Sequence, residues 1–131
     1  KIPSETQLSQ ADFLASLGVD RVMGHHPHVV QPREVIKDYN KETLVIYSLG
    51  NFFSDQYGID RLIGLSVNLN INKDVDGVDA TVSLSDISYE FTYTYKNDDF
   101  TVIRWTTVDE SILPNFNEIS SAKHIIIKRF E

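Results

Sequence analysis

Alternation of apolar and polar residues in the middle of the chain constrains its fold more than any other feature. Within residues 63–71 every second residue is apolar, and the residues between are Gly, Ser or Asn. This period of two is typical of a β-strand with one buried face. Asp76 and Gly77 follow within a polar stretch, residues 72–78, that predicts a hairpin turn. The sequence therefore predicts a hairpin-based β-sheet in this part of the chain.

The returning stretch changes its phase once. Apolar residues occupy even positions in residues 80–84 and odd positions in residues 87–95. One extra residue near Ser85 and Asp86 would invert the buried face, because side chains alternate strictly along a strand. We therefore expect a β-bulge or a break between two strands at this point.

The start of the chain has a different pattern. Residues 4–17 predict a helix, with Ser4 and Gln7 spaced as a capping box and Gly18 as its stop. Residues 19–23 follow as a short buried strand. A helix, a glycine turn and a buried strand form a unit that usually belongs to a layered α/β fold.

The remaining elements are shorter. We expect strands at residues 34–37, 43–48 and 100–108 and a loop at residues 53–61. The tail, residues 110–131, contains either a helix at residues 120–128 or a strand at residues 125–127, and the pattern does not choose between them. The predicted fold class is α/β, α+β by content, and β-rich after residue 30.

Composition excludes several classes of protein. The chain has 131 residues, 12 Lys and Arg against 19 Asp and Glu, and a formal net charge of -7. Its basic residues are scattered, so we expect no nucleic-acid partner. It has no Cys, which excludes disulfides and thiolate metal sites. No apolar run approaches the roughly 20 residues of a membrane span.

The most unusual segment is Gly24-His25-His26-Pro27-His28, which holds three of the four histidines directly after a predicted strand. Neutral imidazole is the commonest metal ligand in proteins. Pro27 stiffens the backbone between the outer two rings, and Gly24 permits a tight exit from the strand. Spacing alone favours a metal site at the C-terminal end of this strand.

Two ordinary interpretations remain beside the metal site. The segment can be a surface loop with incidental histidines, or one histidine can be hydrogen-bonded in the core. The fourth histidine, His124, is expected to be structural or exposed. The pair Gly50-Asn51 after the strand at residues 43–48 either directs an amide into a cleft or forms a turn, and its spacing favours the turn.

Two motifs in this order resemble the closing half of the bacterial capsule synthesis family PGA_cap (CapA). Residues 20–32 read Asp-Arg-Val-Met-Gly-His-His-Pro-His-Val-Val-Gln-Pro, and residues 45–52 read Val-Ile-Tyr-Ser-Leu-Gly-Asn-Phe. The resemblance covers about residues 3–56, and beyond Gln56 it rests on the strand pattern alone. It implies a calcineurin-like fold, in which two sheets pack face to face with helices outside.

The resemblance also implies a function and a location. The family is associated with making or exporting capsular poly-γ-glutamate, so an anionic capsule polymer or its precursors is the implied partner. Its members usually lie outside the cytoplasmic membrane, which implies an extracytoplasmic, membrane-associated parent protein. The whole chain, residues 1–131, is then the C-terminal portion of one domain. Residues 1–56 would be its motif-bearing α/β segment, and residues 57–131 its hairpin segment and tail.

The histidine segment is similar to the last metal-binding motif of the calcineurin-like fold. On this resemblance His26 and His28 are the implied ligands of a divalent ion (Mn, Zn or Fe), and His25 is the alternate ligand or a supporting group. Three further residues are implied to line the site: Gly24, Ser48 and Asn51.

The fold's other ligand motifs are absent from this sequence, which contains no Asp-x-His and no Gly-Asp. We therefore expect an incomplete metal site that an upstream half of the domain completes, and an isolated chain without hydrolase activity, although the parent could be a metal-dependent hydrolase. The alternative is a non-catalytic module that binds an envelope polymer or a partner and carries a vestigial histidine loop. Strands that lack their neighbours should also make the isolated chain self-associate.

Overall fold

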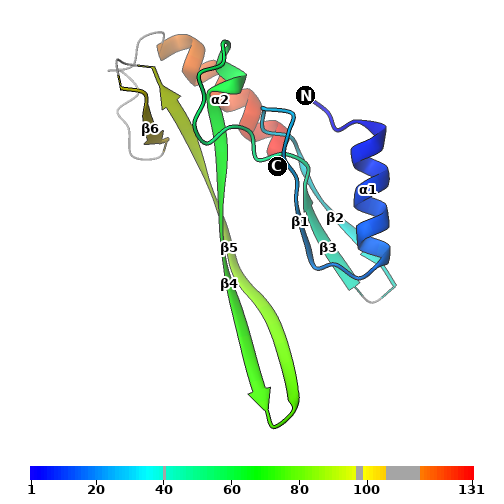
Figure 1. The fold of residues 1–131 in the computed structure, drawn as a ribbon. Helices are drawn as coiled ribbons and strands as arrows, with labels where there is room; N and C mark the ends of the chain where they lie inside the picture. Colours follow the sequence, from blue (N-terminus) through cyan, green and yellow to red (C-terminus); the bar gives the residue numbers. More distant parts are fainter. Residues whose placement is uncertain (40, 97–98, 106–115) are drawn as a thin grey trace.

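The computed structural model describes all residues of the chain except 40, 97–98 and 106–115 (Figure 1). Its elements, in chain order, are α1 (Glu5–Ser16), β1 (Arg21–Met23), β2 (Arg33–Asp38), β3 (Lys41–Ile46), the 3-10 helix η1 (Ile59–Arg61), β4 (Ile63–Asp76), β5 (Asp79–Tyr95), β6 (Thr101–Arg104) and α2 (Phe116–Phe130). The strands form two three-stranded sheets, in the orders β1-β3-β2 and β4-β5-β6. This confirms the predicted fold class, with α+β content and mostly strands after residue 30.

Helix α1 begins where the capping pattern predicts. The Ser4 hydroxyl accepts a hydrogen bond from the Gln7 backbone nitrogen at 3.3 Å, and the Gln7 side chain accepts one from the Ser4 nitrogen at 3.0 Å. This reciprocal pair satisfies two donors that an uncapped helix start would leave free. Ala11 and Ala15 form the buried side of the helix. Their small side chains let α1 pack closely on the first sheet, where Ala11 meets Val45 and Tyr47.

The first sheet combines both strand directions. β1 runs parallel to β3, with Val22 opposite Val45, and β2 runs antiparallel to β3. β3 lies in the centre of the sheet, and its last residues, Val45 and Ile46, are buried. Because β1 and β3 are parallel neighbours, the loops that follow them leave the sheet at the same end of the strands.

The second sheet is a long hairpin with one short added strand. The predicted bulge is confirmed: the pairing shifts between Asn68 and Asn70, opposite the stretch that holds Asp86, and Asp86 has a φ of 52°. The predicted turn was too long, because residues 72–76 remain paired with β5. Asn72, Asp74 and Asp76 share one face of β4, and the sequence pattern did not separate these polar residues from turn residues.

Burial along the hairpin differs from the prediction. Ile63 is 0% exposed, whereas Ile71 is 68%, Val75 64% and Val82 59% exposed. The register places Ile71, Val75 and Val82 on one face, since opposite residues point to the same side of a sheet. Figure 1 shows why: the distal half of β4 and β5 extends away from the rest of the chain. The apolar face that the alternation predicts exists, but only its proximal end is buried.

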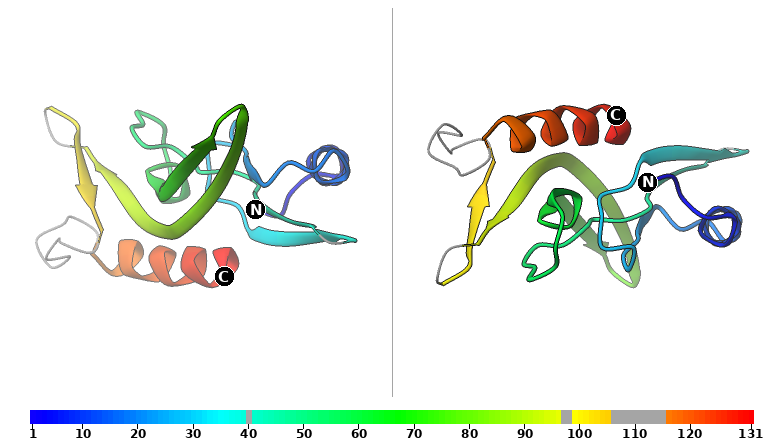
Figure 2. Two further views of the ribbon diagram at one scale, coloured as in Figure 1. Left: turned by 90° about the horizontal axis from the view of Figure 1, so that it is seen from below. Right: turned by 90° about the horizontal axis from the view of Figure 1, so that it is seen from above.

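The main core joins both sheets to α2. Ile46 from the first sheet and Ile63 from the second meet Ile119, Ile126 and Trp105 in one cluster. α2 lies along the second sheet (Figure 2), and the Phe130 ring packs edge-on against Tyr89 and Phe91.

The structure decides two predictions about the end of the chain. The tail forms a helix, which is longer than the predicted residues 120–128 at both ends, and the alternative strand at residues 125–127 is wrong. β6 covers only part of the strand predicted at residues 100–108, whose last three residues lie outside the described part. None of the described helices has the length and apolar character needed to cross a bilayer.

Candidate functional site

The site forms where the loops after β1 and β3 leave the first sheet. Leu49 donates a backbone hydrogen bond to the Gly24 carbonyl at 3.2 Å, and Gln31 donates one to the Ser48 carbonyl at 3.1 Å. Val30 and Leu49 form an isolated antiparallel bridge. The histidine segment and the Tyr-Ser-Leu-Gly-Asn-Phe segment are therefore held against each other by backbone hydrogen bonds, although residues 29–46 separate them in sequence.

Gly24 is required by this arrangement. Its nitrogen donates to the Ile46 carbonyl at 2.7 Å. A Cβ atom at this position would lie 2.2 Å from the Tyr47 carbonyl oxygen and 2.9 Å from that of Ile46. Both obstacles are backbone atoms, so neither can rotate away. The sequence predicted that Gly24 permits a tight turn out of the strand. In the structure the turn is tight because the backbone at the end of β3 lies directly against Gly24.

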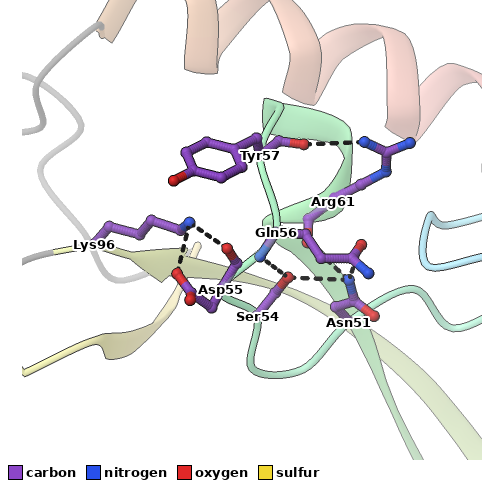
Figure 3. A network of polar contacts seen from close by, with 7 residues as sticks. All are labelled: Asn51, Ser54, Asp55, Gln56, Tyr57, Arg61 and Lys96. Carbon is purple, nitrogen blue, oxygen red and sulfur yellow. Dashed lines mark hydrogen bonds and ion pairs between the residues drawn. The ribbon is translucent and has the colours of Figure 1, made fainter.

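His28 and Asn51 meet at the centre of the site. His28 Nδ1 lies 2.9 Å from the Asn51 side-chain oxygen. The Asn51 amide nitrogen donates to the Arg61 carbonyl at 2.9 Å and contacts the Ser54 hydroxyl at 3.2 Å (Figure 3). Asn51 is only 8% exposed, so these bonds fix the orientation of a nearly buried amide. Asn51 thus directs its oxygen at a histidine and is more than a turn residue.

The backbone at two of the histidines is strained. His26 has a φ of 93° and His28 a φ of 59°. Residues with a Cβ rarely adopt positive φ, and such conformations concentrate at functional sites. The rings of His26 and His28 lie 5.9 Å apart between centroids. The structure therefore brings these two histidines together, at an energetic cost in the backbone.

His25 faces a different part of the molecule. Its Nδ1 accepts a hydrogen bond from the His26 backbone nitrogen at 2.9 Å. The side chain lines a cavity of about 160 Å³ between α1 and the first sheet, together with residues such as Gln7 and Tyr47. Neither His26 nor His28 lines this cavity. His124, expected to be structural or exposed, is exposed on α2.

Two of the predicted lining residues have clear positions. Gly24 lies directly after β1, against the backbone of Ile46 and Tyr47. Ser48 is fully buried, and its hydroxyl accepts a hydrogen bond from the Gly50 nitrogen at 3.2 Å. Ser48 therefore supports the turn that carries Asn51 and presents no group to solvent.

Several contacts had no signal in the sequence. The Gln7 amide donates to the Gln31 side chain at 2.7 Å, which ties α1 to the end of the histidine loop. The Tyr47 hydroxyl donates to the Glu34 carboxylate. Burial raises the pKa of Tyr47, and this hydrogen bond raises it further. These contacts support the two loops of the site. They join residues that are distant in sequence, and the packing of the first sheet brings those residues together.

The side chains at the site offer few ligands for a metal ion. Among the residues that the structure describes, no group of three or more His, Cys, Asp or Glu side chains lies close enough to hold a metal. His26 and His28 supply two imidazoles, and the Asn51 oxygen lies 2.9 Å from His28 Nδ1. The described residues therefore do not form a complete metal site.

Comparison with known proteins finds a family match for the first part of the chain. The family model described as bacterial capsule synthesis protein PGA_cap matches residues 1–56. Residues 1–56 are a PGA_cap family segment. The match contains α1, the first sheet, the histidine segment and Asn51, whereas Arg61, which fixes the Asn51 amide, lies beyond it. No solved structure matches this chain, and the calcineurin-like arrangement implied by the resemblance stays a prediction.

Two curated proteins named CapA are similar to part of this chain. The PGA biosynthesis protein CapA of Bacillus subtilis (strain 168) is 46% identical over 54 residues, which are 41% of this chain and 13% of that protein. The capsule biosynthesis protein CapA of Bacillus anthracis is 43% identical over 54 residues, which are 41% of this chain and 12% of that protein. The matched segment thus spans about an eighth of the length of each relative.

Proposed function

We propose that this chain is part of a capsule-biosynthesis protein that handles poly-γ-glutamate or its precursors. Both relatives are named for biosynthesis of PGA or of capsule, and the family model matches residues 1–56, which include the three histidines of the segment and Asn51. A role in the cell envelope, outside the cytoplasmic membrane, belongs to the same proposal.

The observation that carries a chemical role for the site is the His28–Asn51 pair, which joins the two family motifs at 2.9 Å. We propose that His26 and His28 supply imidazole ligands to a divalent ion, Mn, Zn or Fe, whose other ligands come from elsewhere in a longer protein. The strained backbone at both residues supports a functional role. A cation would also offset the repulsion between an anionic polymer and a chain of net charge -7.

Calorimetric titration of the chain with Zn²⁺ or Mn²⁺ tests the proposed ligands. We expect weak binding, because two imidazoles do not complete a coordination shell. Replacing both His26 and His28 with Ala should lower the affinity by about tenfold or more, the range seen when groups that support a metal are removed. His124→Ala is the matched control, since this exposed histidine lies on α2, and it should leave binding unchanged. Tight stoichiometric binding that survives the double replacement would show that the ligands lie elsewhere.

The second candidate function is a non-catalytic module that binds a polymer or a partner. The absence of a three-ligand group from the described residues favours it. Metal content separates the two functions: a longer protein that contains these residues, binds no metal and hydrolyses no phosphoester would support the binding module.

We also propose that copies of this chain associate through the apolar face of the distal hairpin, which comprises Leu69, Ile71, Val75, Ala80, Val82 and Leu84 around one cation, Lys73. Ile71, Val75 and Val82 are each more than half exposed. The opposite face is acidic, with Asp74, Asp76 and Asp79. Two copies would therefore meet through their apolar faces and keep the acidic faces in water.

Sedimentation at micromolar concentration should then show species heavier than the monomer. Ile71→Asp places a charge on the apolar face and should shift the chain toward the monomer. Asn72→Asp adds the same charge to the opposite face of the same strand and should not. A monomeric unmodified chain would remove this proposal without affecting the histidine site.

A further inference from the structure

We propose that Asn51 is a positioning residue that holds neutral His28 in its Nδ1–H tautomer, so that His28 acts through Nε2. The inference rests on the proposed function only for the use of Nε2 as a ligand. The tautomer itself follows from hydrogen bonds among residues of this chain. Nothing in the sequence distinguishes the two ring nitrogens, because both tautomers fit the same histidine.

The orientation of the Asn51 amide decides the tautomer. Its nitrogen lies 2.9 Å from the Arg61 carbonyl oxygen and 3.4 Å from that of His28. Carbonyl oxygens only accept hydrogen bonds, so the group that faces them must be the NH₂. Turning the amide over would place its oxygen against the Arg61 carbonyl and leave two acceptors facing each other. The Asn51 oxygen is therefore the atom that faces His28.

The partner of that oxygen must donate. An amide oxygen has no proton, so His28 Nδ1, at 2.9 Å, carries the hydrogen. A neutral imidazole has one N–H, and Nε2 then holds the free lone pair. Because Asn51 is nearly buried, the opposite tautomer would leave its oxygen without a donor in a place with little water. Histidines that bind metals are commonly oriented through their other nitrogen in this way.

His25 is held in the opposite tautomer. Its Nδ1 accepts from the His26 backbone nitrogen at 2.9 Å, so the proton of neutral His25 is on Nε2. The Nδ1 lone pair is already used, and Nε2 is a donor. Adjacent residues of one motif thus present different chemistry, and His28 has its lone pair available where His25 does not. This favours His28 over the alternate ligand His25.

The test is a long-range ¹⁵N–¹H correlation spectrum of the full, metal-free chain, recorded at a pH where the imidazoles are neutral. We expect the Nδ1–H tautomer of His28 to exceed the Nε2–H tautomer by about tenfold or more. The Nε2–H tautomer would leave the nearly buried Asn51 oxygen without a donor, and the free-energy cost of an unpaired buried acceptor corresponds to a ratio of that size. His25 should appear as the Nε2–H tautomer in the same spectrum. The two residues serve as internal references for each other.

Two substitutions separate positioning from a merely structural role. Asn51→Asp and Asn51→Ala both lose the hydrogen bond that the Asn51 side-chain nitrogen donates to the Arg61 carbonyl, so both should destabilise the chain. Asn51→Asp keeps an acceptor for His28 Nδ1–H and should retain its tautomer. Asn51→Ala removes the acceptor and should shift His28 toward the Nε2–H form, while His25 stays unchanged.

An Nε2–H tautomer for His28 in the unmodified chain would overturn the inference. So would an Asn51→Ala chain that keeps the Nδ1–H form. If Asn51→Ala does not fold, the unmodified chain and Asn51→Asp still decide, since both must show Nδ1–H. If the metal titration fails but the tautomers are as expected, the proposed ligand role is wrong and the positioning role of Asn51 stands.

Discussion

Replacing Gly24 with Ala is expected to lower the free energy of unfolding by about 3 kcal/mol, the upper range for a group forced into a packed site. The new Cβ would lie 2.2 Å from the Tyr47 carbonyl oxygen. That oxygen belongs to the backbone that follows the central strand, so relief requires β1 or its loop to move away from β3. The same movement would separate His28 from Asn51, and the tautomer of His28 should become mixed. Urea denaturation measures the stability, and the ¹⁵N spectrum measures the site.

Gly77→Ala is the matched control for this prediction. Gly77 lies in the hairpin turn, and a Cβ there meets nothing within 4 Å. Its φ of 63° makes Ala unfavourable by about 1 kcal/mol, so the comparison isolates the steric contact at Gly24. His28 and Asn51 should be unaffected in this control. A Gly24→Ala chain that is as stable as the control would mean that the β1–β3 edge is looser than the structure shows.

The local elements were predictable where one short-range signal decides them. Ser4 and Gln7 mark the start of α1 because a capping box needs only residues three apart. The bulge near Asp86 was predictable for the same reason, since a change of phase in a period-two pattern has few structural explanations.

Pairings between distant residues were predictable only in part. The resemblance placed His28 and Asn51 in one site, yet no spacing rule gives their contact or the orientation of the Asn51 amide. That orientation depends on the Arg61 carbonyl, which reaches Asn51 through the loop that ends in η1. The strain at His26 and His28 was equally hidden, because the sequence shows Pro27 between them and not the backbone angles on either side.

Burial was the least predictable property. Alternation shows which side chains share a face of a strand, and it does not show whether another element covers that face. Ile63 and Ile71 have the same phase on β4, but only Ile63 lies under α2 and the first sheet. The difference comes from the length of the hairpin, which exceeds what the rest of the described chain covers.

Ile63 and Ile71 are expected to differ strongly in what they contribute to stability. Ile63→Ala is expected to destabilise the chain by about 3 to 4 kcal/mol, because it removes a fully buried side chain from the cluster that joins both sheets to α2. Ile71→Ala makes the same chemical change on the same strand, eight residues further along, where the side chain is 68% exposed. It should change stability by no more than about 0.5 kcal/mol. Both are measured by urea denaturation at one low protein concentration, so that association does not contribute.

The two results together test how the hairpin leaves the core. A large loss at both positions would mean that the distal face is covered in solution, through association that persists at low concentration or through a different packing of the hairpin. Sedimentation of the Ile71→Ala chain separates these two causes, because only association depends on the protein concentration. A small loss at Ile63 would instead mean that the two sheets do not share one core. The expected outcome, a large loss at Ile63 and almost none at Ile71, requires the core to end between them, near the bulge at residues 68–70.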